Sequence, residues 1–433
     1  MNLRSSVWIL LAAAATAFAQ TAPPTKLTLR QAEDLALKNH PQVLAAENEV
    51  GAMGQEVVEA RAPYFPALAG EITGSGANQQ ARIGAGFLTA SRLFNRFGQG
   101  INVSQLITDS GRTSNLVASA RLHATAAQQN YTATRYDVLE RVNEAYFGVL
   151  RAQSLVKVAQ QTVDARQTLV DQVTALANNK LRSQLDVTFV DVNLSEAKLL
   201  LIQSNAQLQE AFADLTRAMG SQQTTVYTLA EEPLPPSPPP DVEPLIAQAL
   251  RSRPELAGLA AEREAAYRFE RAERDLSYPT VSLMGVAGYI PFINQVSAPR
   301  MIPNEYGGAA VNVQIPVFNG HLYSARRQEA HYRAMEADQH LRDEEQAVVR
   351  DVHASWATAS TAFQRLDVSA QFLRQATMSL SLAQGRYDIG LASIVELTQA
   401  QLNLTQAEIE NLGAKYDYQV RNAMLQYTIG ALR

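Results

Sequence analysis

The chain has 433 residues, with 37 lysines and arginines against 42 aspartates and glutamates, which gives a net charge of -5 at pH 7. This mild acidity argues against nucleic-acid binding as the main function, because such proteins concentrate positive charge. The chain contains no cysteine. Disulfides, cysteine nucleophiles and thiolate metal sites are therefore excluded, and so is a lipoprotein anchor, whose lipid is carried on a cysteine.

The first nineteen residues have the features of a secretory signal peptide. Arg4 is their only charge, an apolar run follows from Val7 to Ala15, and Ala17-Phe18-Ala19 has the small-x-small form of a cleavage site. The alternative, a short membrane anchor, is disfavoured because the run is too short: a helix needs about 20 apolar residues to span a bilayer. No later segment reaches that length and hydrophobicity. We therefore expect an exported protein, cleaved after Ala19.

The rest of the chain contains two copies of one sequence unit. Repeat mates lie 210 residues apart, among them Asn193 and Asn403, Ala197 and Ala407, and Gly220 and Gly430. The sequence between the copies includes Pro-Pro-Ser-Pro-Pro-Pro, which is typical of an extended, semi-rigid connector. We therefore expect a first repeat over 20–232, a proline-rich linker over 233–244 and a second repeat over 245–433.

Each repeat ends in a proline-free stretch with heptad spacing. Apolar residues recur seven apart at Val142, Val149, Val156, Val163 and Val170, and again at Val352, Ala359, Leu366, Leu373 and Leu380. This spacing predicts long, supercoiled helical hairpins over 112–220 and 320–430. The first helix, Arg112 to Asn178, would be about 100 Å long at 1.5 Å per residue. An ordinary globular bundle is disfavoured, since its helices average about 11–12 residues.

Each repeat also contains a segment in which two stretches have a period of two. This segment covers about 66–108 in the first repeat and about 279–318 in the second. Leu68, Gly70 and Ile72 alternate with polar residues, as do Ile101 and Val103. Val311, Val313, Ile315 and Val317 form the clearest set in the second repeat. Such alternation predicts strands with one apolar face. Four strands cannot close a membrane barrel, for which the smallest number is about eight, so the chain either oligomerises or forms no barrel. Three copies would supply twelve strands.

No catalytic, cofactor-binding or metal-binding residues are predicted. The six histidines have no metal-ligand spacing, and Gly74-Ser75-Gly76 is not the G-x-S-x-G of a nucleophile elbow. No glycine-rich phosphate loop is present. We therefore expect no enzyme activity and no cofactor.

Three further stretches resemble the TolC family of outer-membrane efflux proteins. The repeat opens with a short amphipathic helix and Asn39-His40-Pro41, and an Ala-x-x-x-x-x-Pro approach from Ala60 to Pro66 leads to the first strand. The strongest local signature is the second hairpin turn, Arg-Tyr-Asp-Ile-Gly-Leu-Ala-Ser-Ile-Val-Glu-Leu over 386–397. The resemblance covers nearly the whole chain after the signal peptide, about Leu27 to Leu432.

The resemblance implies a mostly helical homotrimer with a twelve-stranded β-barrel in the outer membrane of a Gram-negative-type bacterium. The barrel would contact outer-membrane lipid, and its helices would continue as an α-helical barrel across the periplasm. A periplasmic adaptor protein and an inner-membrane pump would be its partners in exporting small molecules or proteins. No nucleic acid is expected as a partner.

The resemblance also assigns adaptor docking to the turns between the long helices. The family's docking turns match Leu181 and Ser183 in the first repeat, and Gly390, Leu391 and Ser393 in the second. Lys180 is the repeat mate of Gly390, so the two turns are not equivalent. The simpler alternative is that both are ordinary solvent-exposed turns.

A gate is implied where the helices beyond the second turn lean inward in the family. Its two acidic rings lie one helical turn apart. Glu396 matches the first ring, and Gln399 replaces the acid of the second. Three copies of Glu396 would attract cations to a narrow opening, although one acid per chain makes a weaker ring than two.

The family's latch beside this gate is altered here. Its tyrosine and its acid are kept as Tyr387 and Asp186, but Ala392 stands where the family has an arginine. The repeat mate of Ala392 is Arg182, so the positive charge is expected on the other turn. Alternatively, Arg182 pairs with Asp186 within one helix, or all these residues are ordinary exposed side chains.

Two other functions fit parts of the sequence. A periplasmic adaptor has long helical hairpins and a signal peptide, but would carry one hairpin between two half-domains rather than a duplicated unit with strands in both copies. A coiled-coil filament or adhesin leaves the strands and the repeat unexplained. An export channel accounts for the helical hairpins, the strands and the repeat.

Overall fold

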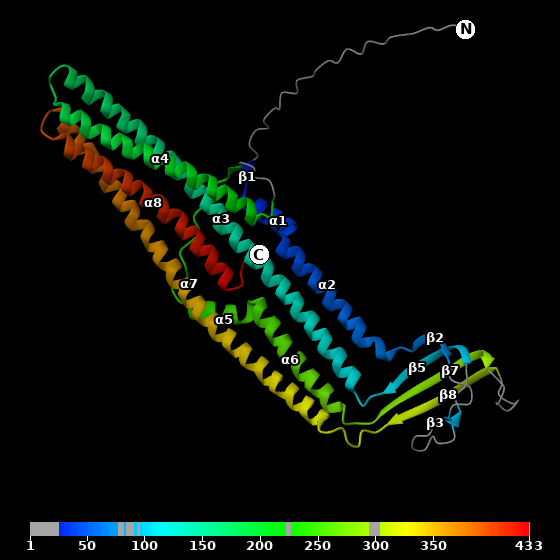
Figure 1. Cartoon of the computed structure of the whole chain (residues 1–433). Helices are drawn as coiled ribbons and strands as arrows, with labels where there is room; N and C mark the ends of the chain where they lie inside the picture. Colours follow the sequence, from blue (N-terminus) through cyan, green and yellow to red (C-terminus); the bar gives the residue numbers. More distant parts are fainter. Residues whose placement is uncertain are drawn as a thin grey trace, which may run out of the picture.

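The computed structural model describes residues 26–76, 82–83, 91–92, 96–221, 227–293 and 304–432. The expected signal peptide and its cleavage site after Ala19 lie outside the described residues. Within them, the chain is a long rod of helices that bends into a β-sheet at one end (Figure 1). Among the described helices, none combines the length and apolar character needed to cross a membrane.

Two 67-residue helices form the rod: α3 (Arg112–Asn178) and α7 (Leu322–Asp388). The first covers the range that the heptads predicted. The helix α4 (Gln184–Ala218) returns along α3, and α8 (Ile394–Thr428) returns along α7. The other half of the rod contains α2 (Pro41–Arg61), against α3, and α6 (Pro254–Asp275), between α3 and α7. The order across the rod is therefore α2, α3, α6, α7 near the sheet, as Figure 1 shows. Near the turns, the neighbouring helices give the order α4, α3, α8, α7.

Short elements join the halves of the rod: α1 (Leu29–Asn39), α5 (Glu243–Ser252), and a parallel pair of β1 (Lys26–Leu27) and β6 (Thr228–Leu229). Fully buried Tyr146 of α3 fixes this pair, because its hydroxyl lies 3.0 Å from the Leu27 carbonyl and 2.7 Å from that of Ala230. The proline-rich linker is shorter than predicted. Its last two residues, Glu243 and Pro244, open α5, since proline is tolerated in a first helical turn.

The sheet has the order β2, β5, β7, β8, and all its neighbours are antiparallel. Its strands are β2 (Ala67–Ser75), β5 (Arg96–Thr108), β7 (Thr280–Ile293) and β8 (Glu305–Gln314); a 3-10 turn (Ala62–Tyr64) precedes β2. The two-residue strands β3 (Arg82–Ile83) and β4 (Ser91–Arg92) pair separately. The last strand ends before the predicted Val317, because Pro316 has no N–H for the ladder.

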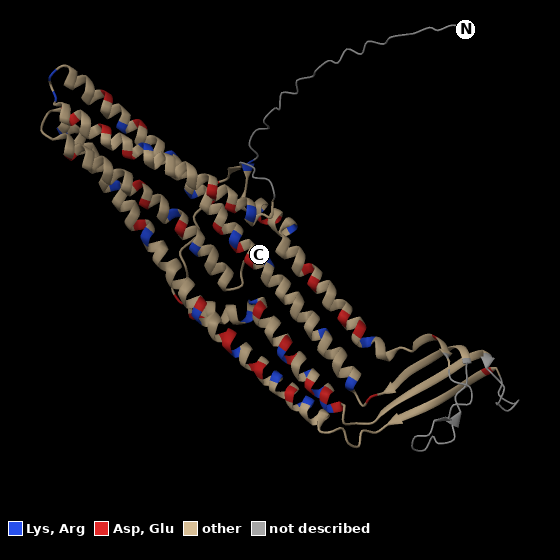
Figure 2. Cartoon of the chain, in the orientation of Figure 1, with Lys and Arg blue, Asp and Glu red and all other residues tan. Residues whose placement is uncertain are grey.

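Register places the alternating apolar residues of the strands on one face of the sheet, although β7 is apolar on both faces, since Met284 and Val286 lie on the side of Asn102. Leu68 pairs with Val103, and Leu283 pairs with Val311, all on the same side. On the other side, Asn102 Nδ2 donates to Glu71 Oε1 at 2.6 Å. Charged side chains are common along the helices and sparse on these strands (Figure 2). Both faces are exposed in the single chain, with Leu68 68% and Val311 67% exposed.

Candidate functional site

The candidate site lies at the end of the rod opposite the sheet, where both hairpins turn (Figure 1). The two turns share one backbone design. The N–H groups of Leu181 and Leu391 each donate to the carbonyl five residues earlier, at 2.9 and 2.8 Å. The preceding residues adopt left-handed conformations, with φ of 61° at Lys180 and 76° at Gly390. This is a Schellman ending, in which glycine is the favoured left-handed residue and Lys180 carries a conformational cost.

The two turn serines are helix N-caps. Ser183 Oγ accepts from the Asp186 N–H at 3.2 Å, and the Asp186 carboxylate accepts from the Ser183 N–H at 3.1 Å, which completes a capping box. Ser393 Oγ accepts from the Glu396 N–H at 3.2 Å. Each serine therefore has a local structural function, and it is the leucines beside them that face outward.

The turns expose apolar side chains. Leu181 is 70% exposed and Leu391 is 68% exposed, and neighbouring Ile389 is 71% exposed. Directly behind them, Ala392 and Ile394 are buried in a cluster that joins both hairpins. The rod therefore ends in a packed base that carries exposed leucine and isoleucine side chains.

The structure brings Arg182 of the first turn onto Tyr387, in the last turn of α7. The guanidinium carbon lies 4.7 Å from the ring centroid, within cation–π range. Tyr387 is buried, and burial raises the pKa of its hydroxyl; Arg182 opposes that rise, whereas Asp186 and Asp388 add to it. The hydroxyl has no hydrogen-bond partner within the described chain. The contact between the hairpins is therefore made by the ring face.

Arg182 does not lie in the same helix as Asp186. The helix α4 begins at Gln184, because Ser183 has the extended backbone of an N-cap. Ion pairs among the described residues do not include one between Arg182 and Asp186. The acid is engaged by the cap, and the guanidinium is placed over Tyr387.

Glu396 pairs with a residue that the sequence did not single out. Its carboxylate lies 3.3 Å from Arg386 Nε, and Arg386 Nη2 also donates to the Leu391 carbonyl at 3.3 Å. The repeat mate of Arg386 is Leu176, so only its place in the turn signature drew attention to it. Gln399 lies one turn further on the same exposed face of α8 and donates to Asn403 at 3.0 Å.

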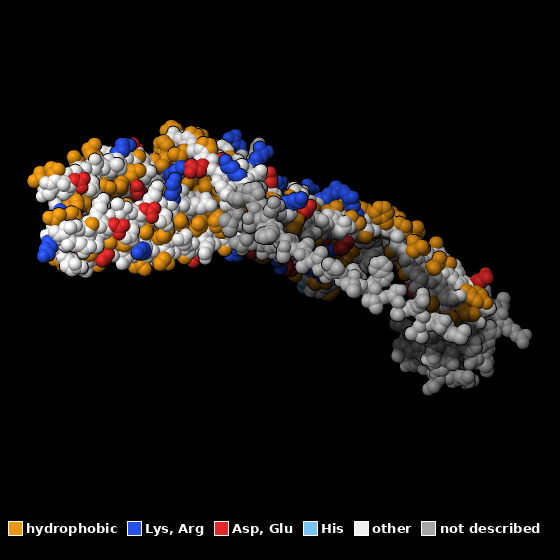
Figure 3. Space-filling view, turned by 90° about the horizontal axis from the view of Figure 1, so that it is seen from above, with side chains coloured by type: hydrophobic (Ala, Val, Ile, Leu, Met, Phe, Trp, Pro, Cys, Tyr) orange, Lys and Arg blue, Asp and Glu red, His pale blue; other side chains and the backbone are white. Residues whose placement is uncertain are grey.

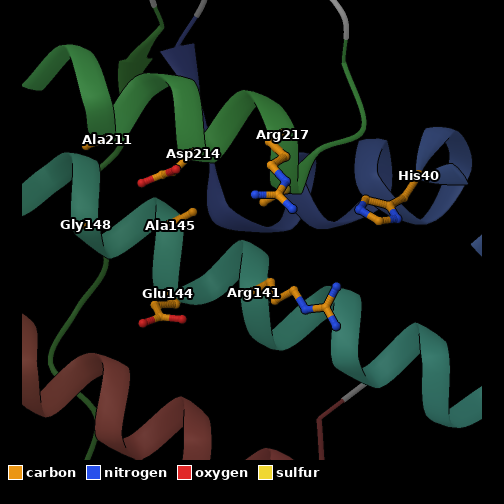
Figure 4. A pocket seen from close by; sticks show the side chains of 9 residues that line it. His40, Arg141, Glu144, Ala145, Gly148, Ala211, Asp214 and Arg217 are labelled. Carbon is orange, nitrogen blue, oxygen red and sulfur yellow. The ribbon is translucent and has the colours of Figure 1, made fainter. Parts of the chain in front are cut away.

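A cleft of about 550 Å³ lies away from the turns, where α1 and α2 meet the end of α4 above α3 (Figure 4). Arg141 and Glu144 come from α3, and Asp214 and Arg217 come from α4. His40 lies between α1 and α2, and its Nδ1 accepts from the Gln42 N–H at 3.3 Å. Burial lowers the pKa of His40, and the nearby arginines add to that effect. Sequence reasoning missed this cleft, because its residues come from three distant segments.

Comparisons with known proteins find similar sequences and structures over most of the chain. The family model described as outer membrane efflux protein matches residues 33–221 and 245–431. The chain is 22% identical to the outer membrane protein TolC of Salmonella enteritidis, over 94% of this chain and 83% of that protein. It is 26% identical to the protein CyaE of Bordetella pertussis, over 87% of this chain and 78% of that protein. A solved membrane protein of Pseudomonas aeruginosa superposes with a TM-score of 0.79 at 20% identity, over 93% of each chain.

Proposed function

The chain belongs to the outer membrane efflux protein family, and from that membership we propose that three copies form one export duct across the outer membrane and the periplasm. The protein is an outer-membrane efflux channel and not an enzyme. Its helices and sheet have the arrangement of solved outer-membrane channels. One chain cannot enclose a passage by itself, because its described four-stranded sheet is open at both edges.

The open sheet is the observation that carries the proposal. In the described chain, β2 and β8 are edge strands with no neighbour on their outer sides. Edge N–H and C=O groups in lipid each cost several kcal/mol, so a membrane sheet must close. The strands have 9 to 14 residues, enough for the about 9–11 that a tilted membrane strand needs. Three copies close into twelve strands with no free edge.

The faces of the sheet set its orientation in the membrane. The apolar face, which includes Leu68, Leu283 and Val311, contacts outer-membrane lipid. The face with Glu71 and Asn102 lines a wet interior. In the view of Figure 3, hydrophobic side chains follow the sheet and also form patches along the helices.

The helical edges carry matching apolar stripes. On α4, Leu185, Val192 and Leu199 follow one another at intervals of seven and are 77%, 55% and 58% exposed. On α7, at the other edge of the rod, Val368 and Leu382 are 66% and 63% exposed and lie two heptads apart. Heptad stripes pack against another helix. The α4 edge of one copy therefore packs on the α7 edge of the next, which closes an α-helical barrel.

The exposed turns dock the periplasmic adaptor, and the adaptor links the duct to an inner-membrane pump. Leu181, Gly390 and Leu391 form the contact surface, and Ser183 and Ser393 hold the turns in shape. This assignment rests on the exposed apolar tips and on the family's architecture.

The same end holds the gate. Stacking of Arg182 on Tyr387, with Asp186 beside it, ties the first hairpin to the second. Glu396 and Gln399 face the opening, and Arg386 partly neutralises the ring of Glu396. The resting duct is therefore closed mainly by packing and by the Arg182 contact, with a weak electrostatic filter for cations.

Assembly and conduction test this function together. Mass measurement of the purified mature chain in detergent should give about three chains per particle, and planar bilayers should show discrete channel currents. A monomeric particle that conducts would overturn the trimer. A trimer without currents, even after the gate contact is removed by Arg182→Ala, would overturn the channel.

A further inference from the structure

An arginine is buried in a seam of small residues along α3. Ala145, Ala152 and Ala159 follow at intervals of seven; the next position is Arg166 and the one after it is Val173. Arg166 is only 4% exposed. Its Nη1 atom is buried without a hydrogen-bond partner in the described chain. Burial lowers the pKa of the guanidinium, and the negative charge of Glu196 on α4 only partly offsets that effect.

Arg166 lines a cavity of about 350 Å³ where the two hairpins meet. The cavity wall from α3 includes Arg166. The wall from α8 includes Gln401 and Glu408, and Leu380 of α7 and Leu404 of α8 add apolar surface. Its volume falls within the range of small-molecule sites, about 300–1,000 Å³, and far exceeds the roughly 30 Å³ share of one water molecule.

The polar groups of the two walls have opposite character. Arg166 Nη1 is a donor without a partner, and buried Gln401 Oε1 is an acceptor without a partner, both within the described chain. A buried polar atom without a partner is unfavourable, so each of these atoms favours an occupant that can satisfy it. Glu408 adds a carboxyl on the side of Gln401, and burial raises its pKa. An occupant must therefore accept on the α3 side and donate on the α8 side.

We propose that this cavity binds a small zwitterionic molecule that bridges the two hairpins. Its carboxylate accepts from Arg166, and its ammonium group donates to Gln401 and faces Glu408. An apolar chain between the charged groups lies along Leu380 and Leu404. This site goes beyond the duct itself, because passage through a wide lumen needs no binding site within the wall.

Three matched probes test the charge pattern by calorimetric titration of the full mature chain in detergent. The probes are 6-aminohexanoate, hexanoate, which lacks the ammonium group, and hexylamine, which lacks the carboxylate. We expect 6-aminohexanoate to bind at least tenfold more tightly than either, because only it satisfies both walls. Equal binding of hexanoate would mean a simple anion site, and no binding by any probe would mean a water-filled cavity; either result overturns the proposal.

Two variants locate the site. Arg166→Ala restores the alanine spacing of the seam and should keep the helical circular dichroism while weakening 6-aminohexanoate at least tenfold. Glu408→Gln keeps the shape and should reduce the advantage of 6-aminohexanoate over hexanoate. Arg151→Ala, an exposed arginine on the same helix, is the matched control and should change nothing. Unchanged binding in Arg166→Ala would place the probe elsewhere and contradict the inference, whatever the conductance of the channel.

Discussion

Arg182 and Tyr387 belong to different repeats, yet they contact each other at the turns. A guanidinium over a partly desolvated ring contributes about 1 kcal/mol. The contact occurs once per chain, so the proposed trimer would hold three. Small individual contributions of this kind suit a gate, because a few of them together shift the balance between closed and open states without locking it.

We predict that Arg182→Ala raises the resting conductance in planar bilayers at least fivefold, since about 1 kcal/mol is lost per chain. Tyr387→Phe should leave the conductance near its original value, because the ring remains and the hydroxyl has no partner in the described chain. Lys180→Asn removes a positive charge from the same turn without touching the ring and is the control. If Lys180→Asn opens the channel as much as Arg182→Ala, net charge rather than stacking holds it closed.

At the scale of the elements, each turn uses different side chains to hold its backbone and to face the solvent. The serines are fixed by capping bonds within their own turns, and the leucines beside them are largely exposed. A bulky residue at either serine would therefore damage the helix start as well as any docking surface. Substitution of the leucines tests docking alone.

We predict that Leu181→Asp with Leu391→Asp abolishes export from cells, measured as accumulation of a fluorescent efflux substrate, while the trimer still assembles. The reason is that both side chains are exposed, so their loss removes an apolar contact and little packing. Ser183→Asp keeps a good N-cap and should export normally. Normal export by the double leucine variant would exclude the turns as the docking surface.

At the scale of the whole molecule, the proposed assembly can be tested by cross-linking, because the chain has no cysteine and introduced cysteines would be its only thiols. Val192 is eight residues from the start of α4, and Leu382 is six residues before the end of α7, so both lie at similar heights above the turns. In one chain, α3 and α8 separate these two edges. Neighbouring copies would bring them together.

We predict that Val192→Cys combined with Leu382→Cys, treated with a short bifunctional thiol reagent, gives bands of two and three chains on a denaturing gel. Each single variant should remain a monomer band, because equivalent positions on different copies lie far apart. A double variant that never forms a three-chain band under conditions where the trimer is intact would contradict the proposed edge-to-edge packing.

The sequence by itself determined the elements. Heptads gave the span of α3 because helix periodicity is a local property, and alternation located the four strands for the same reason. The resemblance located the turns at Ser183, Ser393 and Gly390, but the serines were expected to dock a partner. Their capping function came from the structure, although caps depend on immediate neighbours. The count of four strands also motivated the proposal that several chains share one barrel.

Only the tertiary structure decided which side chains meet. Arg182 and Tyr387, which are in contact, and Arg166 and Glu408, which line one cavity, are pairs more than 200 residues apart. Their placement depends on how two hairpins rotate and slide against each other. Arg386 and Glu396 are close in sequence, but the path of the turn decides whether they pair. Such placements result from many weak packing contacts summed over the whole rod, and no local pattern in the chain encodes that sum.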